Sequence, residues 1–172
     1  MTDVLREIAA LNQAFQELTG ARTGVFKVDL RKLPELFAYC PSRRNFFTKM
    51  SCLASILKMN VKALQSTVEN YEQQWGGIRL FEAFLEAHSV PRNPSRFKLW
   101  HDIEQFGNPA LRGMFAEDSA ENIRKRMDLD AAYPTEDFHA LWDGLLGRLL
   151  QSLRDCNLIL RSLIQQKTHP SA

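Results

Sequence analysis

The sequence has little cysteine and no long apolar run. Its three cysteines, Cys40, Cys52 and Cys156, are widely spaced over 172 residues and include no Cys-x-x-Cys pair. That usage predicts reduced thiols and a cytoplasmic protein. No window of about 18 apolar residues exists, so we expect no membrane-spanning helix. The first residues also lack the basic and apolar regions of a signal peptide.

Motifs for catalysis or cofactor binding are sparse as well. The sequence has no glycine-rich phosphate loop, and no Ser-His-Asp or Cys-His set can be argued from spacing. Glu136 and His139 have the Glu-x-x-His spacing of di-iron carboxylate bundles, but the second copy that such a site needs is missing. Acidic residues also favour a helix N-terminus without any metal. We therefore expect no metal and no cofactor.

What the sequence has in abundance is helical periodicity. From Pro134 to Lys167, apolar residues recur every three or four positions, as in one helix about 50 Å long. The stripe consists of Phe138, Trp142, Leu145, Leu149, Leu153, Cys156, Leu160 and Leu163. Further apolar residues widen it, so this helix needs cover on more than one side. We predict an all-α fold, a single domain over residues 1–172, organised on this C-terminal helix.

Shorter periodic segments upstream supply the cover. We predict helices over 3–19, about 34–40, 43–58, 61–75, 78–88, 95–106, 110–116 and 119–129, with a loop over 21–29. Ser42 is the predicted N-cap of the helix over 43–58. The first of these has an inner face that steps by four and three residues. Because the apolar stripes of the first and last helices look wider than one short chain can cover, we expect a homodimer.

Charge is distributed unevenly along the chain. The net charge is only +2, yet residues 22–62 hold nine basic and two acidic side chains, and residues 102–143 hold ten acidic and four basic ones. A basic segment can bind a polyanion. Alternatively, the two segments complement each other within the fold or between subunits. The aromatics interleaved with the basic residues, Phe26, Phe37, Tyr39, Phe46 and Phe47, either stack on bases or form core.

Residues 53–68, which overlap the end of the basic segment, resemble the core of the helix-turn-helix motif. In that motif, apolar residues and one small residue lock two helices together. Leu53, Leu57, Met59 and Leu64 have the apolar offsets, and Ala54 has the small one. The resemblance implies a second helix facing the major groove, with basic side chains on phosphates. The implied nucleic-acid-binding residues are Arg43, Arg44, Lys49, Lys58, Lys62, Gln65 and Ser66. The alternative is an ordinary helical hairpin.

A second resemblance rests on Arg96 and His101, an Arg-x4-His sequence. It is similar to the signature of the HEPN superfamily of all-helical proteins. The resemblance implies a dimeric, metal-independent ribonuclease with Arg96 and His101 as catalytic residues. The His would move a proton at the 2′-oxygen or the leaving oxygen, and the Arg would stabilise charge on the phosphate. The alternative is two exposed residues at the start of a helix.

Three functional hypotheses follow, in order of preference. The first is a non-catalytic, nucleic-acid-associated regulatory protein that contacts DNA or RNA through a basic helical hairpin. The second is a HEPN-like ribonuclease or an inactive relative. The third is an adaptor of helical-bundle type whose grooves bind a helix of another protein.

Overall fold

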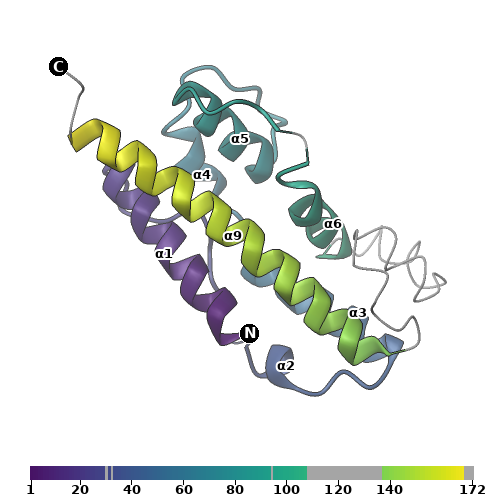
Figure 1. Ribbon diagram of the computed structural model, residues 1–172. Coiled ribbons are helices and arrows are strands. Elements are labelled where there is room, and N and C mark those ends of the chain that lie inside the picture. The colour runs from purple at the N-terminus through teal and green to yellow at the C-terminus, as the bar shows by residue number, and fades with distance from the viewer. Residues whose placement is uncertain (30, 32, 94, 108–136, 169–172) are drawn as a thin grey trace. The chain divides into compact units, whose positions relative to one another are not determined.

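The computed structural model describes residues 1–29, 31, 33–93, 95–107 and 137–168 (Figure 1). Regular secondary structure in these residues is helical, apart from one isolated β-bridge. The helices are α1 (Thr2–Thr19), α2 (Leu33–Phe37), α3 (Arg43–Ile56), α4 (Val61–Gln65), α5 (Gly77–Ala87), α6 (Lys98–Gly107) and α9 (Phe138–Thr168). The prediction of an all-α fold is confirmed. The helices predicted over 110–116 and 119–129 lie outside the described residues.

The chain forms two compact units, each assembled from segments far apart in sequence. The first unit contains Met1, Val28–Leu57 and Lys98–Leu150, and the second contains Thr2–Lys27, Lys58–Phe97 and Gln151–Ala172. Helix α9 contributes its first part to the first unit and its last part to the second. That residues 1–172 form a single domain stays a prediction.

The first unit is built around the N-terminal ends of α3 and α9. Ser42 caps α3 as predicted, because its Oγ accepts a hydrogen bond of 3.3 Å from the backbone N–H of Asn45. One turn further on, the buried Phe46 ring lies 6.2 Å from Trp142 and 6.1 Å from Phe138, measured between ring centroids. Helix α6 packs against α3 in the same unit.

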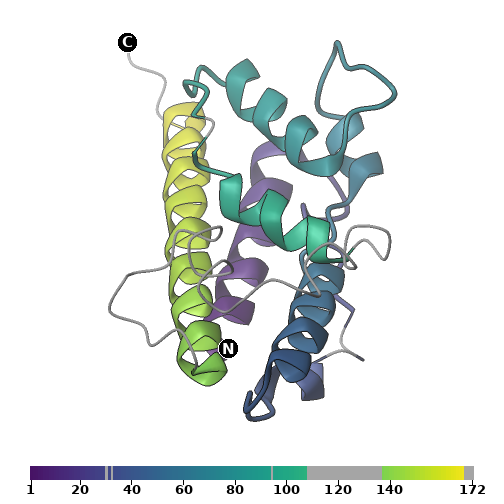
Figure 2. The same ribbon diagram turned by 90° about the vertical axis from the view of Figure 1, so that its right-hand side faces the viewer.

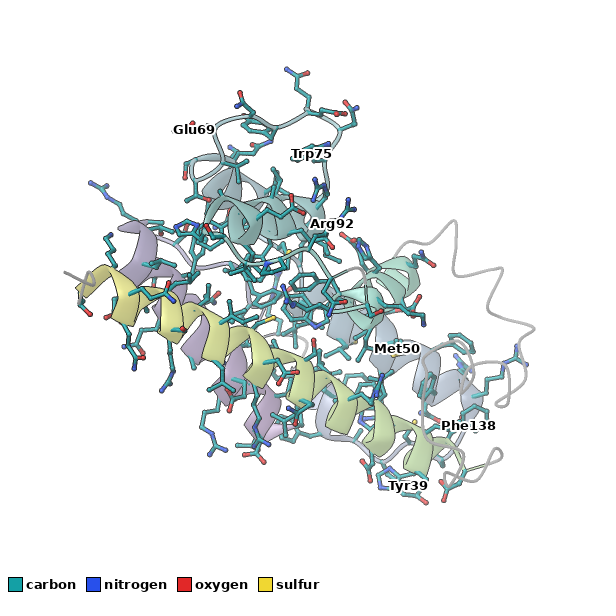
Figure 3. The ribbon with its side chains drawn as sticks, turned by 45° about the horizontal axis from the view of Figure 1, so that its top comes forward. Tyr39, Met50, Glu69, Trp75, Arg92 and Phe138 are labelled. Carbon is teal, nitrogen blue, oxygen red and sulfur yellow. The ribbon has the colours of Figure 1, made fainter. Side chains whose placement is uncertain are left out.

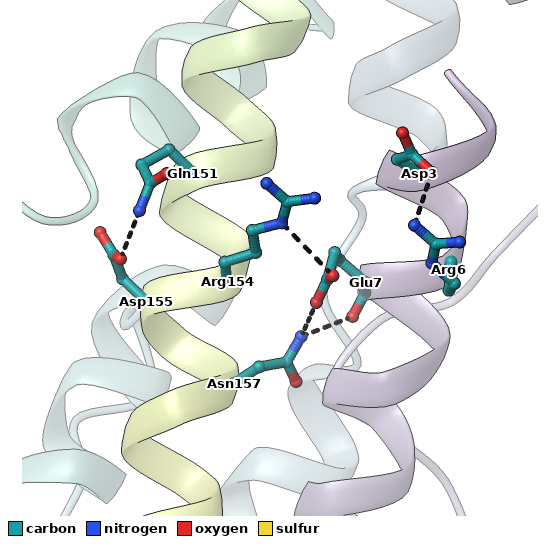
Figure 4. A network of polar contacts seen from close by, with 7 residues as sticks. All are labelled: Asp3, Arg6, Glu7, Gln151, Arg154, Asp155 and Asn157. Atoms are coloured by element: carbon teal, nitrogen blue, oxygen red, sulfur yellow. Dashed lines mark hydrogen bonds and ion pairs between the residues drawn. The ribbon is translucent and has the colours of Figure 1, made fainter.

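In the second unit, α1 runs parallel to the last part of α9 (Figure 1). Asn157 Nδ2 donates to the carboxylate of Glu7 at 2.7 Å and to its backbone carbonyl at 3.0 Å, and Arg154 Nε lies 3.6 Å from the same carboxylate (Figure 4). At the other end of α1, Lys167 Nζ donates to the carbonyl of Leu18 at 3.1 Å. These polar contacts fix the register of the two helices.

The apolar faces of both helices are covered within the chain. All of the predicted inner residues of α1 are buried, namely Val4, Ile8, Leu11, Phe15 and Leu18. The same holds for the predicted α9 stripe from Trp142 to Leu163, while Phe138 is half-buried. The width of these stripes was the reason for expecting a homodimer. The central residues are covered within the chain, whereas Leu158 of α9 is 66% exposed. The dimer itself stays a prediction.

The helix predicted over 61–75 is wrong, because α4 ends at Gln65. The hydroxyls of Ser66 and Thr67 each donate to the carbonyl three residues back, at 2.7 and 2.8 Å. The backbone N–H of Thr67 bonds to the carbonyl three residues back as well, rather than four. Side-chain hydroxyls thus compete for the carbonyls of the last turn and close the helix early.

Two of the three cysteines are part of the core. All three are free thiols, and Cys40 and Cys156 are buried. Burial raises the pKa of the Cys40 thiol to about 11 and that of Cys156 to about 12. Both are therefore neutral at physiological pH and pack as small apolar side chains. Within the described ranges, no helix combines the length and the apolar character needed to cross a membrane.

The start of α5 depends on a glycine that touches the turn before α4. A Cβ on Gly77 would overlap the side chain of Met59, whereas a Cβ on Gly76 would meet nothing. We expect Gly77→Ala to lower the free energy of unfolding by about 1–3 kcal/mol, the usual cost of overpacking. Gly76→Ala, the matched control, should change it by less than about 0.5 kcal/mol, because the backbone there suits any residue. Urea denaturation of both variants measures this. Equal losses would contradict the close approach to Met59.

Candidate nucleic-acid interface

The side chain of Asn12 in α1 holds the last part of loop 20–27 in place. Its Oδ1 accepts from the backbone N–H of Phe26 at 2.8 Å, and its Nδ2 donates to the carbonyl of Phe26 at 3.2 Å. Asn12 thus pairs with this loop as a neighbouring strand would. A Cβ on Gly24 would overlap the Asn12 side chain, so glycine is needed at that position. The loop therefore has a defined path over α1.

The same loop pairs with the turn between α3 and α4. Phe26 and Met59 form an antiparallel bridge, and the N–H of Lys27 donates to the carbonyl of Lys58 at 2.8 Å. The Phe26 and Met59 side chains are buried. Because successive side chains of an extended segment alternate between faces, Lys27 and Lys58 project together on the other face. Both are exposed.

A second asparagine, Asn60, ties the two segments together. Its backbone N–H donates to the carbonyl of Val25 at 2.6 Å, and its Nδ2 donates to Thr23 Oγ1 at 2.9 Å. The Asn60 side chain is buried, so these bonds are shielded from water and from competition with it. The loop and the turn consequently form one fixed structure in the second unit.

Four exposed cations lie on these segments and at the start of α4. We call them the basic loop pair: Arg22 and Lys27 of the loop, Lys58 of the turn and Lys62 of α4. Within the described part of the chain, none of their side chains takes part in an ion pair or a hydrogen bond. Like charges placed directly opposite each other, as Lys27 and Lys58 are, repel. An anion bound between them would relieve that repulsion, so the basic loop pair is suited to a polyanion.

The predicted binding residues fall into separate groups. Lys58 and Lys62 belong to the basic loop pair. Ser66 is exposed, but its hydroxyl already donates to a carbonyl of α4, and Gln65 is half-buried. The prediction omitted Arg22 as a binding residue. It also omitted Lys27. Arg22 and Lys27 had been counted in the basic segment, but the pairing of loop 20–27 with residues 58–60 has no local sequence signal that would have identified them as a site.

The remaining predicted cations belong to the first unit. Arg43 is half-buried, and its guanidinium carbon lies 5.7 Å from the ring centroid of Phe47. Arg44 is exposed. The structure therefore does not gather the predicted binding residues into one surface of a single unit.

The prediction that Lys49 contacts nucleic acid is wrong. The side chain is fully buried, and its Nζ donates to the carbonyls of Glu35 at 2.8 Å and Leu36 at 3.1 Å. It also lies 5.2 Å from the ring centroid of Trp142. Lys49 thus satisfies carbonyls at the C-terminal end of α2. Burial lowers the pKa of its ammonium group.

The aromatics of the basic segment serve different purposes. Phe26 and Phe46 are buried and belong to the core, as one interpretation predicted. Phe37 and Tyr39 are 56% and 66% exposed, and the Tyr39 ring lies 4.5 Å from that of His139, measured between centroids. All of the exposed members lie in the first unit, so they are not part of the basic loop pair.

The Arg-x4-His pair is split between the units. Arg96 precedes α6, and its carbonyl accepts a hydrogen bond of 3.4 Å from Ser152 Oγ of the second unit. His101 is exposed on α6 in the first unit. The two residues therefore do not share a helix, and their catalytic role stays a prediction. Glu136 lies outside the described residues; among those described, no cluster of three or more His, Cys, Asp or Glu side chains could hold a metal ion.

No family model matches the chain, and no match was found among the curated proteins or the solved structures. The function must therefore be argued from the arrangement of the residues themselves.

The contribution of the buried Lys49 to the stability of the protein can be tested by its dependence on pH. Lys49→Met leaves two carbonyls without a donor, and we expect the free energy of unfolding at neutral pH to fall by about 1–3 kcal/mol. Arg44→Met, on the exposed side of the same helix, is the matched control and should change little. Because burial lowers the pKa of Lys49, the unfolded chain binds more protons than the folded chain as the pH approaches 10.5. Raising the pH should therefore stabilise the wild type relative to Lys49→Met.

Urea denaturation of both proteins at about pH 7, 8.5 and 10 measures this difference, and the comparison cancels the titration of groups that both proteins share. A difference that stays constant or shrinks would contradict a buried, charged Lys49.

Proposed function

We propose that this protein is a non-catalytic, nucleic-acid-associated protein with a regulatory role, which binds backbone phosphates through the basic loop pair. The observation that carries the proposal is the pairing that places the exposed Lys27 opposite the exposed Lys58, with the exposed Arg22 and Lys62 a few residues away in the sequence of the same two segments. Such cations are the usual partners of phosphate groups.

The rigidity of the scaffold supports this assignment. The loop is fixed by Asn12 and the turn by Asn60, so little backbone entropy is lost when a ligand binds. Lysine ammonium groups act as point charges that contact phosphates in many orientations. The proposed contacts would therefore position a nucleic acid without reading its sequence.

The contact proposed here differs from that of a helix-turn-helix protein. Helix α4 has five residues, which corresponds to about 7.5 Å of helix. A recognition helix that lies in the major groove needs several side chains over a longer span. The basic loop pair, rather than a recognition helix, is the binding element of the proposal.

Salt dependence tests the proposal. With four phosphate contacts, the logarithm of the association constant should fall against the logarithm of salt concentration with a slope of about −3. Fluorescence anisotropy of labelled RNA and DNA oligonucleotides, titrated with the full chain at about 50 and 200 mM salt, measures it. Lys27→Glu combined with Lys58→Glu should weaken binding at least tenfold at the lower salt concentration and roughly halve the slope.

The matched control is Arg44→Glu combined with Arg161→Glu, which makes the same change in net charge at exposed positions outside the basic loop pair. It should retain most of the affinity. Binding that ignores salt, or that the control weakens as much as the test variant, would refute the proposal.

A further inference from the structure

The basic loop pair adjoins a second, aromatic element of the same unit. Loop 66–76 joins α4 to α5 and contains no helix or strand (Figure 2). Its first residue follows α4, which carries Lys62, and its last residue precedes Gly77, which packs against Met59 beside Lys58. Both ends of the loop are thus attached to the segment that carries two of the four cations.

This loop carries two accessible aromatic side chains. Tyr71 is 40% exposed, and Trp75 is half-exposed. Trp75 lies on the loop at the top of the view in Figure 3. The guanidinium carbon of Arg79 in α5 lies 4.6 Å from the Trp75 ring centroid, and Arg79 also forms an ion pair with Glu86 at 3.1 Å. The cation–π contact restrains the indole while leaving part of it open to solvent.

We infer that the basic loop pair and loop 66–76 form one binding site for single-stranded nucleic acid, an inference that rests on the proposed function. The four cations contact phosphates, and Tyr71 and Trp75 stack on bases. A base can stack on an aromatic side chain only when it is not stacked within a duplex, so this combination favours single strands. The short α4 offers no competing means of reading a duplex groove.

The acidic residues of the loop are consistent with phosphate contacts at the cations and base contacts at the aromatic loop. Glu69 and Glu72 repel phosphates, and the Glu72 carboxylate accepts a hydrogen bond from the Gln74 amide. The backbone of a bound strand is therefore kept on the lysine side, and its bases face the aromatic loop.

The tryptophans make the site directly observable. Of the three in the chain, Trp100 and Trp142 are 3% and 2% exposed, so Trp75 is the one that a ligand can reach. Addition of a 12-nucleotide oligouridylate to the full chain at about 50 mM salt should quench tryptophan fluorescence. A 12-base-pair RNA duplex should bind at least about fivefold more weakly and quench less. Trp75→Phe should abolish the quenching.

Tyr71→Ala should weaken oligouridylate binding by about fivefold or more, because a lost stacking contact costs that much. Tyr39→Ala, which removes an exposed tyrosine of the first unit, is the control and should leave the affinity unchanged. Matching circular dichroism spectra would establish that the variants are folded.

The outcomes separate the two proposals. Equal affinity for duplex and single strand, or an unchanged affinity in Tyr71→Ala, overturns the aromatic site. The proposed function survives that result if Lys27→Glu combined with Lys58→Glu still weakens binding. Absence of salt-sensitive binding to any oligonucleotide overturns both.

Discussion

The hydrogen bonds between the Asn12 side chain and the backbone of Phe26 determine where loop 20–27 lies. Asn12 sits in the middle of α1, whose apolar face is buried in the second unit, so its amide is held by the core beneath it. The pairing places Phe26 opposite Met59, and that in turn places Lys27 opposite Lys58. Backbone hydrogen bonds and the Asn60 side chain then hold the two short extended segments in register, against the repulsion between the like charges of Lys27 and Lys58.

The basic side chains of residues 22–62 therefore have several different environments in the fold. Lys49 is buried beneath α2, and Arg31 pairs with Asp29 at 2.9 Å. Arg43 rests on an aromatic ring. The cations at the two ends of the segment, Arg22, Lys27, Lys58 and Lys62, are exposed in the second unit, and their side chains form no ion pair with the described residues. A run of positive charge in sequence is thus a poor guide to a positive surface, because the backbone turns between one cation and the next.

The sequence predicted those features that depend on local pattern. The inner faces of α1 and α9 repeat every three or four residues, and burial follows that repeat directly. The Ser42 cap is equally local. The early end of α4 was missed because hydroxyl groups compete with the backbone there. The proposed binding surface was missed in part because the Phe26–Met59 pairing joins segments far apart in sequence, and no periodicity encodes such a pair.

The central claim is that a nucleic acid contacts the paired loops of the second unit and not the start of α3. Two-dimensional ¹H–¹⁵N NMR spectra, recorded while a 12-nucleotide oligouridylate is added to the labelled full chain, test it most directly. The account predicts the largest shifts at the amides of Lys27, Lys58 and Tyr71 and at the indole N–H of Trp75. Shifts confined to the amides around Arg43 and Arg44 would contradict it.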